Sequence, residues 1–250
     1  MMQLDGAQDI IAAVRLAFHK EPRLGPRFDL DRITVESDGT LALEGNVTRL
    51  AEKKLALLHA AAVPGVVGLV DRVHVVPVTP MGDRHIRAQL REMFAQDSNF
   101  SDLELREDVA AGVLETEFKP VAGSVESARG RIDIEVEGGI VTLNGTVPTL
   151  VRKRLAGVMA WWIPGVRDVI NGIVVDPPEE DGPDQIEEAV RVVLDRNPAV
   201  DAAQIRVGAR AKVVQLTGMV RSEPTREVAE RDAWAVFGVD DVINKIEVRP

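Results

Sequence analysis

The stretch Leu143-Asn144-Gly145-Thr146-Val147 decides the fold, because it belongs to a pattern that occurs three times in the chain. In every copy a second glycine follows the first after twenty residues, and a valine stands two residues after the first glycine. The three windows align without a gap, which indicates one supersecondary unit used three times. The glycine pairs are Gly45 and Gly65, Gly145 and Gly165, and Gly218 and Gly238.

An amphipathic helix is predicted at the start of each repeat. Apolar residues recur at i, i+3, i+4, i+7 and i+8, which places them on one face of an α-helix. The first repeat has the same offsets as the third, and the second has one polar break. In the third repeat the series is Ile186, Ala189, Val190, Val193 and Leu194.

A β-hairpin is predicted after this helix. In the first repeat Ile33 and Val35 alternate with polar residues, Ser37-Asp38-Gly39-Thr40 gives a turn, and Leu41 and Leu43 continue the alternation. Acidic residues near Gly39 resemble a calcium loop only loosely, since the twelve-residue ligand pattern is missing. Asp-Gly is a preferred hairpin turn. The first glycine of each pair is expected to end the second strand, where a bend or a close backbone approach leaves no room for a Cβ atom.

A second helix and a last strand complete each repeat. Thr149 or Ser222 is expected to cap the helix, and Pro224 suits its first turn. Alanines repeat at two of its inward positions, which predicts close packing against the sheet. The predicted fold is therefore α+β: three tandem α-β-β-α-β units, each a small three-stranded mixed sheet with two helices on one face. The second and third strands should be parallel.

Two proline-containing linkers, at residues 76–82 and 176–183, divide the chain. The predicted domains are residues 1–78, 79–178 and 179–250, and the second carries an insertion at about residues 97–130. Within it, Leu103-Glu104-Leu105-Arg106 alternates like a strand. Either this segment or Arg131 to Val136 is the first strand of the second repeat, and the sequence leaves both open.

Composition limits the possible chemistry. The 250 residues include no cysteine, so disulfides, thiolate metal sites and cysteine nucleophiles are excluded. His19, His59, His74 and His85 form no zinc-binding motif, and neither a Gly-x-Ser-x-Gly elbow nor a phosphate loop is present. We therefore predict no catalytic residue, no metal site and no cofactor. The formal net charge of −10 disfavours nucleic-acid binding.

The sequence also bears on the compartment. Its longest apolar runs are far shorter than a membrane span, so no spanning helix is expected. The N-terminal residues show no basic segment before an apolar run. The expected location is the cytoplasm, or the periplasm if a signal segment has been removed. Nothing in the sequence predicts the oligomeric state.

One basic column is the first candidate site. Lys53, Lys153 and Arg226 occupy the same position of the second helix in the three repeats, and the second repeat extends the column to Arg152-Lys153-Arg154. Cations near a helix N-terminus oppose the helix dipole. A local anion-facing role is therefore one interpretation, and an ordinary solubilising surface is the other.

Trp161 and Trp162, at the other end of the same helix, are the second candidate feature. Adjacent helical residues cannot both face one core. Arg154, Val158 and Trp161 are spaced to share a face, and Trp162 is expected to be the more buried tryptophan. This face suits either an anionic membrane surface or a contact between repeats or with a protein partner.

The repeated pattern resembles the BON domain, a family named for bacterial osmotically inducible and nodulation proteins. The resemblance rests on Val141 to Val147, Gly165-Val166 and Ile173 to Val175, with equivalents in the other two repeats. It covers most of the chain except the linkers and the insertion. The third copy departs by having Phe237 in place of proline.

The resemblance implies three tandem BON domains with structural glycines and no catalytic residues. It implies a non-enzymatic binding protein that docks on phospholipid or cell-envelope surfaces, with a stress-related role. The lipid-binding candidates under this interpretation are Arg152, Lys153, Arg154, Trp161, Lys53 and Arg226. The alternative is a soluble scaffold or small-ligand-binding protein whose repeats mediate protein contacts.

Overall fold

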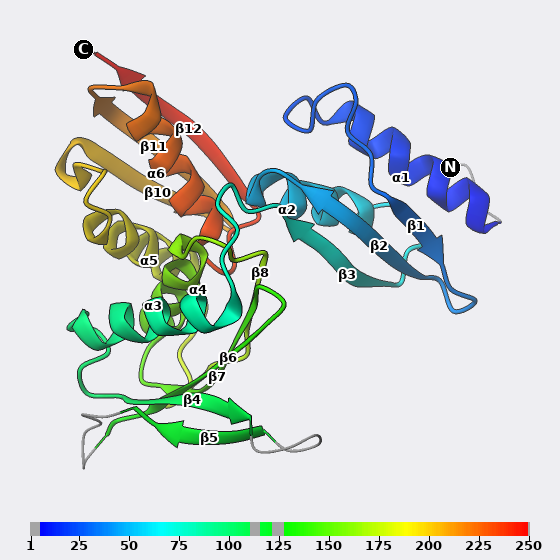
Figure 1. Ribbon diagram of the computed structural model, residues 1–250. Helices are drawn as coiled ribbons and strands as arrows, with labels where there is room; N and C mark the ends of the chain where they lie inside the picture. Colours follow the sequence, from blue (N-terminus) through cyan, green and yellow to red (C-terminus); the bar gives the residue numbers. More distant parts are fainter. Residues whose placement is uncertain (1–5, 111–115, 122–127, 250) are drawn as a thin grey trace. The chain divides into compact units, whose positions relative to one another are not determined.

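The computed structural model describes residues 6–110, 116–121 and 128–249 (Figure 1). It divides the chain into two compact units, Met1–Val76 and Pro77–Pro250. The first unit contains repeat 1, and the second contains repeats 2 and 3.

Repeat 1 has the predicted element order. Its sheet has the order β1-β2-β3, with β1 and β2 antiparallel and β2 and β3 parallel. The prediction of a mixed three-stranded sheet is therefore confirmed for this repeat. The elements are α1 (Ala7–Lys20), β1 (Arg32–Val35), β2 (Thr40–Val47), α2 (Leu50–Ala61) and β3 (Gly68–Val75).

The core of repeat 1 lies between its sheet and both helices. Leu41 and Leu43 of β2 alternate onto the inner face and are fully buried. Ala56 and Ala60 of α2 are also fully buried, as the predicted close helix–sheet approach requires. Thr34, on the opposite face of β1, is exposed. One face of the sheet is therefore covered and the other is open to solvent.

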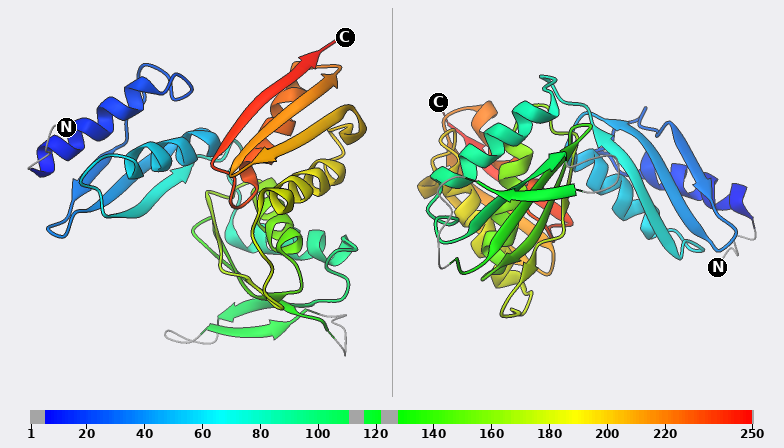
Figure 2. Two further views of the ribbon diagram at one scale, coloured as in Figure 1. Left: turned by 180° about the vertical axis from the view of Figure 1, so that it is seen from behind. Right: turned by 60° about the horizontal axis from the view of Figure 1, so that its bottom comes forward.

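Repeat 3 keeps the same topology. β10 pairs antiparallel with β11, and β11 pairs parallel with β12. The back view in Figure 2 shows these strands in front of α6. Ser222 caps α6 by accepting a hydrogen bond from the Thr225 amide, and Pro224 lies in the first turn, as predicted. The elements are α5 (Pro183–Arg196), η1 (Ala202–Gln204), β10 (Ile205–Arg210), β11 (Val213–Val220), α6 (Glu223–Ala235) and β12 (Asp241–Val248).

Repeat 2 contains the same unit with an enlarged sheet. Its six strands have the order β5-β4-β6-β7-β8, and β9 also pairs with β7. Thr149 caps α4 as predicted. The elements are α3 (Asp83–Gln96), β4 (Glu104–Ala110), β5 (Thr116–Pro120), β6 (Arg131–Glu137), β7 (Ile140–Val147), α4 (Leu150–Trp162), β8 (Asp168–Asn171) and β9 (Val174–Val175).

The insertion accounts for the larger sheet, and the expectation of three strands is wrong for repeat 2. The hairpin β6–β7 is the repeat's own, and β4 adds to it in parallel with β6. The strand that begins at Glu104 is therefore the inserted one. β5 extends the edge further, and the last strand is divided into β8 and β9. Residues 111–115 and 122–127 of the predicted insertion lie outside the described residues.

Ion pairs from α3 hold the inserted strand. Arg87 Nε lies 2.8 Å from Asp108 Oδ1, and Arg91 Nη1 lies 3.1 Å from Glu107 Oε1. Burial raises the pKa of Asp108, although the Arg87 guanidinium acts in the opposite direction. These contacts fix β4 against a helix that belongs to the repeat's ordinary fold.

The first glycine of each pair lies inside a strand rather than at its end, which corrects the prediction. β2, β7 and β11 each continue for two residues beyond it, to Val47, Val147 and Val220. The predicted close backbone approach is present. Gly145 has φ +112°, and a Cβ atom there would overlap the carbonyl oxygen of Arg131 on the neighbouring strand. Any side chain at this position is therefore both strained and blocked.

We expect Gly145→Ala to destabilise unit 2 by about 2 kcal/mol or more, because the Cβ atom meets rigid backbone in a left-handed conformation. The matched control is Gly182→Ala in the linker, where a Cβ atom would meet nothing within 4 Å. Thermal unfolding of the full chain measures both effects. Equal melting temperatures for Gly145→Ala and the wild type would contradict this account.

Candidate functional site

Three cations of the basic column and its extension are paired within their own repeats. Lys53 is only 5% exposed, and its Nζ lies 2.9 Å from Asp71 Oδ2. Arg152 Nη1 donates to Asp102 Oδ1 at 2.7 Å, and Arg226 pairs with Glu223 one turn earlier. These three side chains are therefore ion-paired rather than freely exposed charges.

Arg154 is fully buried, which corrects the expectation that it shares an exposed face with Val158 and Trp161. Its Nε donates to the carbonyl oxygen of Phe237 at 2.9 Å, and its Nη2 donates to Asp181 Oδ1 at 2.5 Å. Val158 is also fully buried. The reason is that α4 packs against α5 and α6 of repeat 3, so the outward face of this helix is an inter-repeat contact.

Lys153 contributes to the same contact. Its Nζ lies 5.0 Å from the centroid of the Phe237 ring, within the range of a cation–π interaction. Burial lowers the pKa of Lys153, the Arg154 charge lowers it further, and Asp181 opposes both. Phe237, the residue that replaces the expected proline, thus contacts two successive cations of α4.

The tryptophans also lie beside repeat 3. Both Trp161 and Trp162 are half-buried, so the structure does not make Trp162 clearly the more buried of the two. Trp162 Nε1 donates to Asp232 Oδ1 at 2.9 Å. Asp232 is fully buried on α6 and accepts a second hydrogen bond, of 2.5 Å, from Asn197 Nδ2 at the C-cap of α5. One carboxylate therefore connects three helices from two repeats.

Burial raises the pKa of Asp232, while the hydrogen bonds from Trp162 and Asn197 lower it. Sequence reasoning missed this residue and its partners. A signal was present, because Asp232 interrupts a segment whose equivalent in repeat 2, Leu155 to Ile163, is entirely apolar. A carboxylate in such a position needs donors, and the nearest indole on the neighbouring repeat supplies one.

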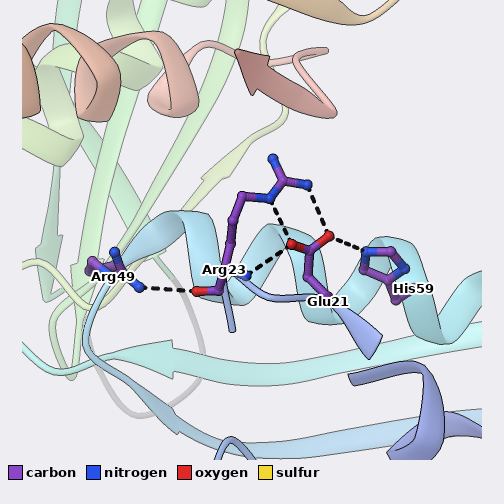
Figure 3. Close-up of polar contacts among 4 residues, drawn as sticks. All are labelled: Glu21, Arg23, Arg49 and His59. Atoms are coloured by element: carbon purple, nitrogen blue, oxygen red, sulfur yellow. Dashed lines mark hydrogen bonds and ion pairs between the residues drawn. The ribbon is translucent and has the colours of Figure 1, made fainter. Parts of the chain in front are cut away.

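The equivalent position in repeat 1 is filled differently (Figure 3). Glu21 is the C-cap of α1, as Asn197 is of α5, and His59 stands where Asp232 stands in repeat 3. Glu21 accepts hydrogen bonds from Arg23 Nε at 2.7 Å and Nη2 at 3.0 Å, and its Oε2 lies 3.0 Å from His59 Nε2. In repeat 1 the carboxylate therefore accepts hydrogen bonds from an arginine of the same repeat, whereas in repeat 3 it accepts one from a tryptophan of the neighbouring repeat.

Metal ligation and membrane insertion also bear on function. Within residues 6–110, 116–121 and 128–249, no cluster of three histidine or acidic side chains has the geometry of a metal site. In the same residues, none of the helices combines the length and apolarity that crossing a bilayer requires.

The model of the BON domain family matches residues 7–77, 120–177 and 183–250, which together make up most of the chain. The chain belongs to the BON domain family. BON domains are non-catalytic binding modules associated with phospholipid and envelope surfaces. The prediction of three tandem BON copies is confirmed, and the Arg154 contact joins the second copy to the third.

Comparison with other proteins adds little to this assignment. No curated protein matches the chain. Two structures of CdsD, a structural protein of the type III secretion system of Chlamydia trachomatis, are similar at 15% and 16% identity. The matches cover 100% and 97% of this chain and 100% and 93% of the other, each with a TM-score of 0.25. A similarity this low carries no argument about function.

The contacts of Glu21 with Arg23 and His59 make the stability of repeat 1 depend on pH. Hydrogen bonds from Arg23 lower the pKa of Glu21 from 4.5 to about 2, with a smaller contribution from His59 and an opposing one from burial. Because the folded-state pKa is depressed, the stabilisation is complete above the unfolded value of 4.5 and is lost as the pH falls through about 2. At about 1.4 kcal/mol per pKa unit such a shift would correspond to roughly 3 kcal/mol, and solvent screening at this partly exposed site reduces that contribution.

We expect Glu21→Gln to lower the unfolding free energy of repeat 1 at neutral pH. The difference from wild type should shrink as the pH falls from about 5 towards 2. Urea denaturation followed over this range measures the effect, and Glu36→Gln, at an exposed position in the same repeat, is the control. A difference that stays constant with pH would show that the carboxylate charge of Glu21 does not stabilise the repeat.

Proposed function

We propose that the protein is a non-enzymatic binding scaffold of three BON domains, divided near residues 78 and 178, in which repeats 2 and 3 act as one body. The observation that supports this most directly is the burial of Arg154 between its two partners in the third repeat and the linker. A guanidinium removed from water requires its hydrogen bonds, so the two repeats depend on each other. A fixed pair presents its remaining surfaces to partners in one constant geometry.

Docking on phospholipid or envelope surfaces, with a stress-related role, is the second candidate. Membership of the BON family favours it. The net charge of −10 opposes approach to anionic lipid, and the cations of the basic column already have carboxylate or aromatic partners. The scaffold function is therefore the better supported of the two.

The scaffold function predicts that two arginines on the same helix differ in effect. Arg154→Ala should loosen repeat 3 from repeat 2 and lower the stability of unit 2 by about 3 kcal/mol, because it removes a buried hydrogen-bonded cation. Arg152→Ala should have a smaller effect, since Arg152 is paired with Asp102 inside repeat 2. Limited proteolysis at residues 176–183 measures the loosening in the full chain. Equal cleavage rates for the two variants would contradict a rigid repeat pair.

Vesicle binding tests the second candidate. We expect Arg154→Glu and Trp161→Ala to change the stability of unit 2 while co-sedimentation with anionic vesicles stays at the wild-type level, at low and high salt alike. Neutral vesicles serve as the control. Salt-sensitive binding by the wild type that Arg154→Glu abolishes without loss of stability would instead favour lipid docking through α4.

A further inference from the structure

The second helices of the three repeats differ in how much of their surface is apolar. From Leu155 to Ile163 in α4 no residue is polar, and from Leu55 to Val63 in α2 only His59 is polar. The equivalent segment of α6 contains Glu230, Arg231 and Asp232. A helix that is apolar on all sides is normally buried on all sides. The C-terminal halves of two of the three helices therefore call for a covering partner beyond their own sheet.

α4 has such a partner, whereas the equivalent face of α2 is open. Val158 and Leu58 occupy the same position in their repeats. Val158 is fully buried on α4, which packs on repeat 3, but Leu58 is 40% exposed. On α1, Leu16 is 55% exposed. Among the helices of the described residues, these two leucines are the large hydrophobic side chains left exposed.

The contact between repeats 2 and 3 shows what chemistry covers this kind of face. The element that packs most extensively on α4 is α5, the first helix of another BON repeat. Leu16 lies on the first helix of repeat 1, and Leu58 lies on its second helix. Repeat 1 thus carries both parts of such a contact: a second helix and a first helix, each with one exposed leucine.

We propose that repeat 1 pairs with repeat 1 of a second copy of this chain, with α2 of each copy packed on α1 of the other. This inference rests on the proposed scaffold function. A two-fold axis makes the arrangement self-complementary, because Leu58 of one copy meets Leu16 of its partner and the reverse contact forms as well. The pairing buries four leucines that are otherwise exposed to water.

The charge distribution supports a second copy as the partner. Residues 6–76 contain nine acidic and nine basic residues, so the whole net charge of −10 lies in the remainder of the chain. Two copies that meet through repeat 1 therefore bring together domains that carry no net charge. Glu21, which follows α1, is already held by Arg23 and His59, so its carboxylate is not left unpaired beside the two leucines.

Sedimentation velocity of the full chain over a range of concentrations tests the pairing. The wild type should show a monomer–dimer equilibrium, and Leu58→Glu or Leu16→Glu should raise the dissociation constant at least tenfold. Met219→Glu is the matched control, because Met219 is 44% exposed on a strand of repeat 3. It should leave the equilibrium unchanged. A wild type that stays monomeric up to roughly 1 mM, the weak limit of specific association, would overturn the proposal.

Cross-linking tests the arrangement, and the absence of native cysteine makes it specific. Chains carrying Leu16→Cys mixed with chains carrying Leu58→Cys should form disulfide-linked dimers under mild oxidation, and more of them than either variant alone. Equal yields in all three samples would overturn the packing of α2 on α1. Vesicle binding that Leu58→Glu abolishes, by a chain that stays monomeric, would assign this face to lipid and overturn the proposal.

These outcomes are separate from those of the scaffold test. If Arg154→Ala and Arg152→Ala were cleaved equally within residues 176–183, the scaffold function would fail, whether the protein is a monomer or a dimer. If the wild type were monomeric while Arg154→Ala still loosened repeat 3, only the pairing through repeat 1 would fail.

Discussion

The second unit depends on the buried guanidinium of Arg154. A charge without solvent is tolerated only when protein groups replace its water, and both of its hydrogen-bond acceptors lie beyond repeat 2. Asp181 is itself 48% exposed, so the ion pair lies at the edge of the contact and only the cation is fully desolvated. The free-energy cost of burying the ion pair is therefore lower, because only one of the two charges leaves water. Repeat 3 is still required, because its Phe237 carbonyl accepts one of the hydrogen bonds of Arg154.

The departures of repeat 3 from the common pattern follow from the same contact. Proline follows the second helix in repeats 1 and 2, but repeat 3 has Phe237 there. Its carbonyl oxygen accepts from Arg154, and its ring receives the Lys153 ammonium. At the next residue, Gly238, a Cβ atom would lie 3.2 Å from Arg154 Nη2. A glycine that the repeat pattern explains as a turn residue therefore also makes room for the neighbour's side chain.

Periodicity within a repeat was enough to predict the fold of each repeat. It failed to predict the burial of residues such as Arg154, whose partners lie in another part of the chain. The alternation of Ile33, Leu41 and Leu43 and the alanine positions of α2 each describe one buried face, and the structure confirms them. Arginine is rarely buried, so the sequence predicts Arg154 at the surface, and no local pattern contradicts that. The inserted strand from Glu104 was ambiguous for a similar reason, because its partner β6 lies far along the chain and alternation alone does not specify a neighbour.

The same reasoning defines where unit 2 still offers binding surface. Its helical side is partly occupied, because α4 is covered by repeat 3 and α3 holds the inserted strand through Arg87 and Arg91. On its regular secondary structure, the large hydrophobic side chains that remain exposed in the described residues all lie on strands: Ile170, Val174, Met219 and Ile243. In repeat 1, by contrast, two leucines are exposed on helices, in addition to Val70 on a strand. Identical folds thus present different surfaces, since the outward residues of each second helix determine whether its helical side is used inside the chain or left open.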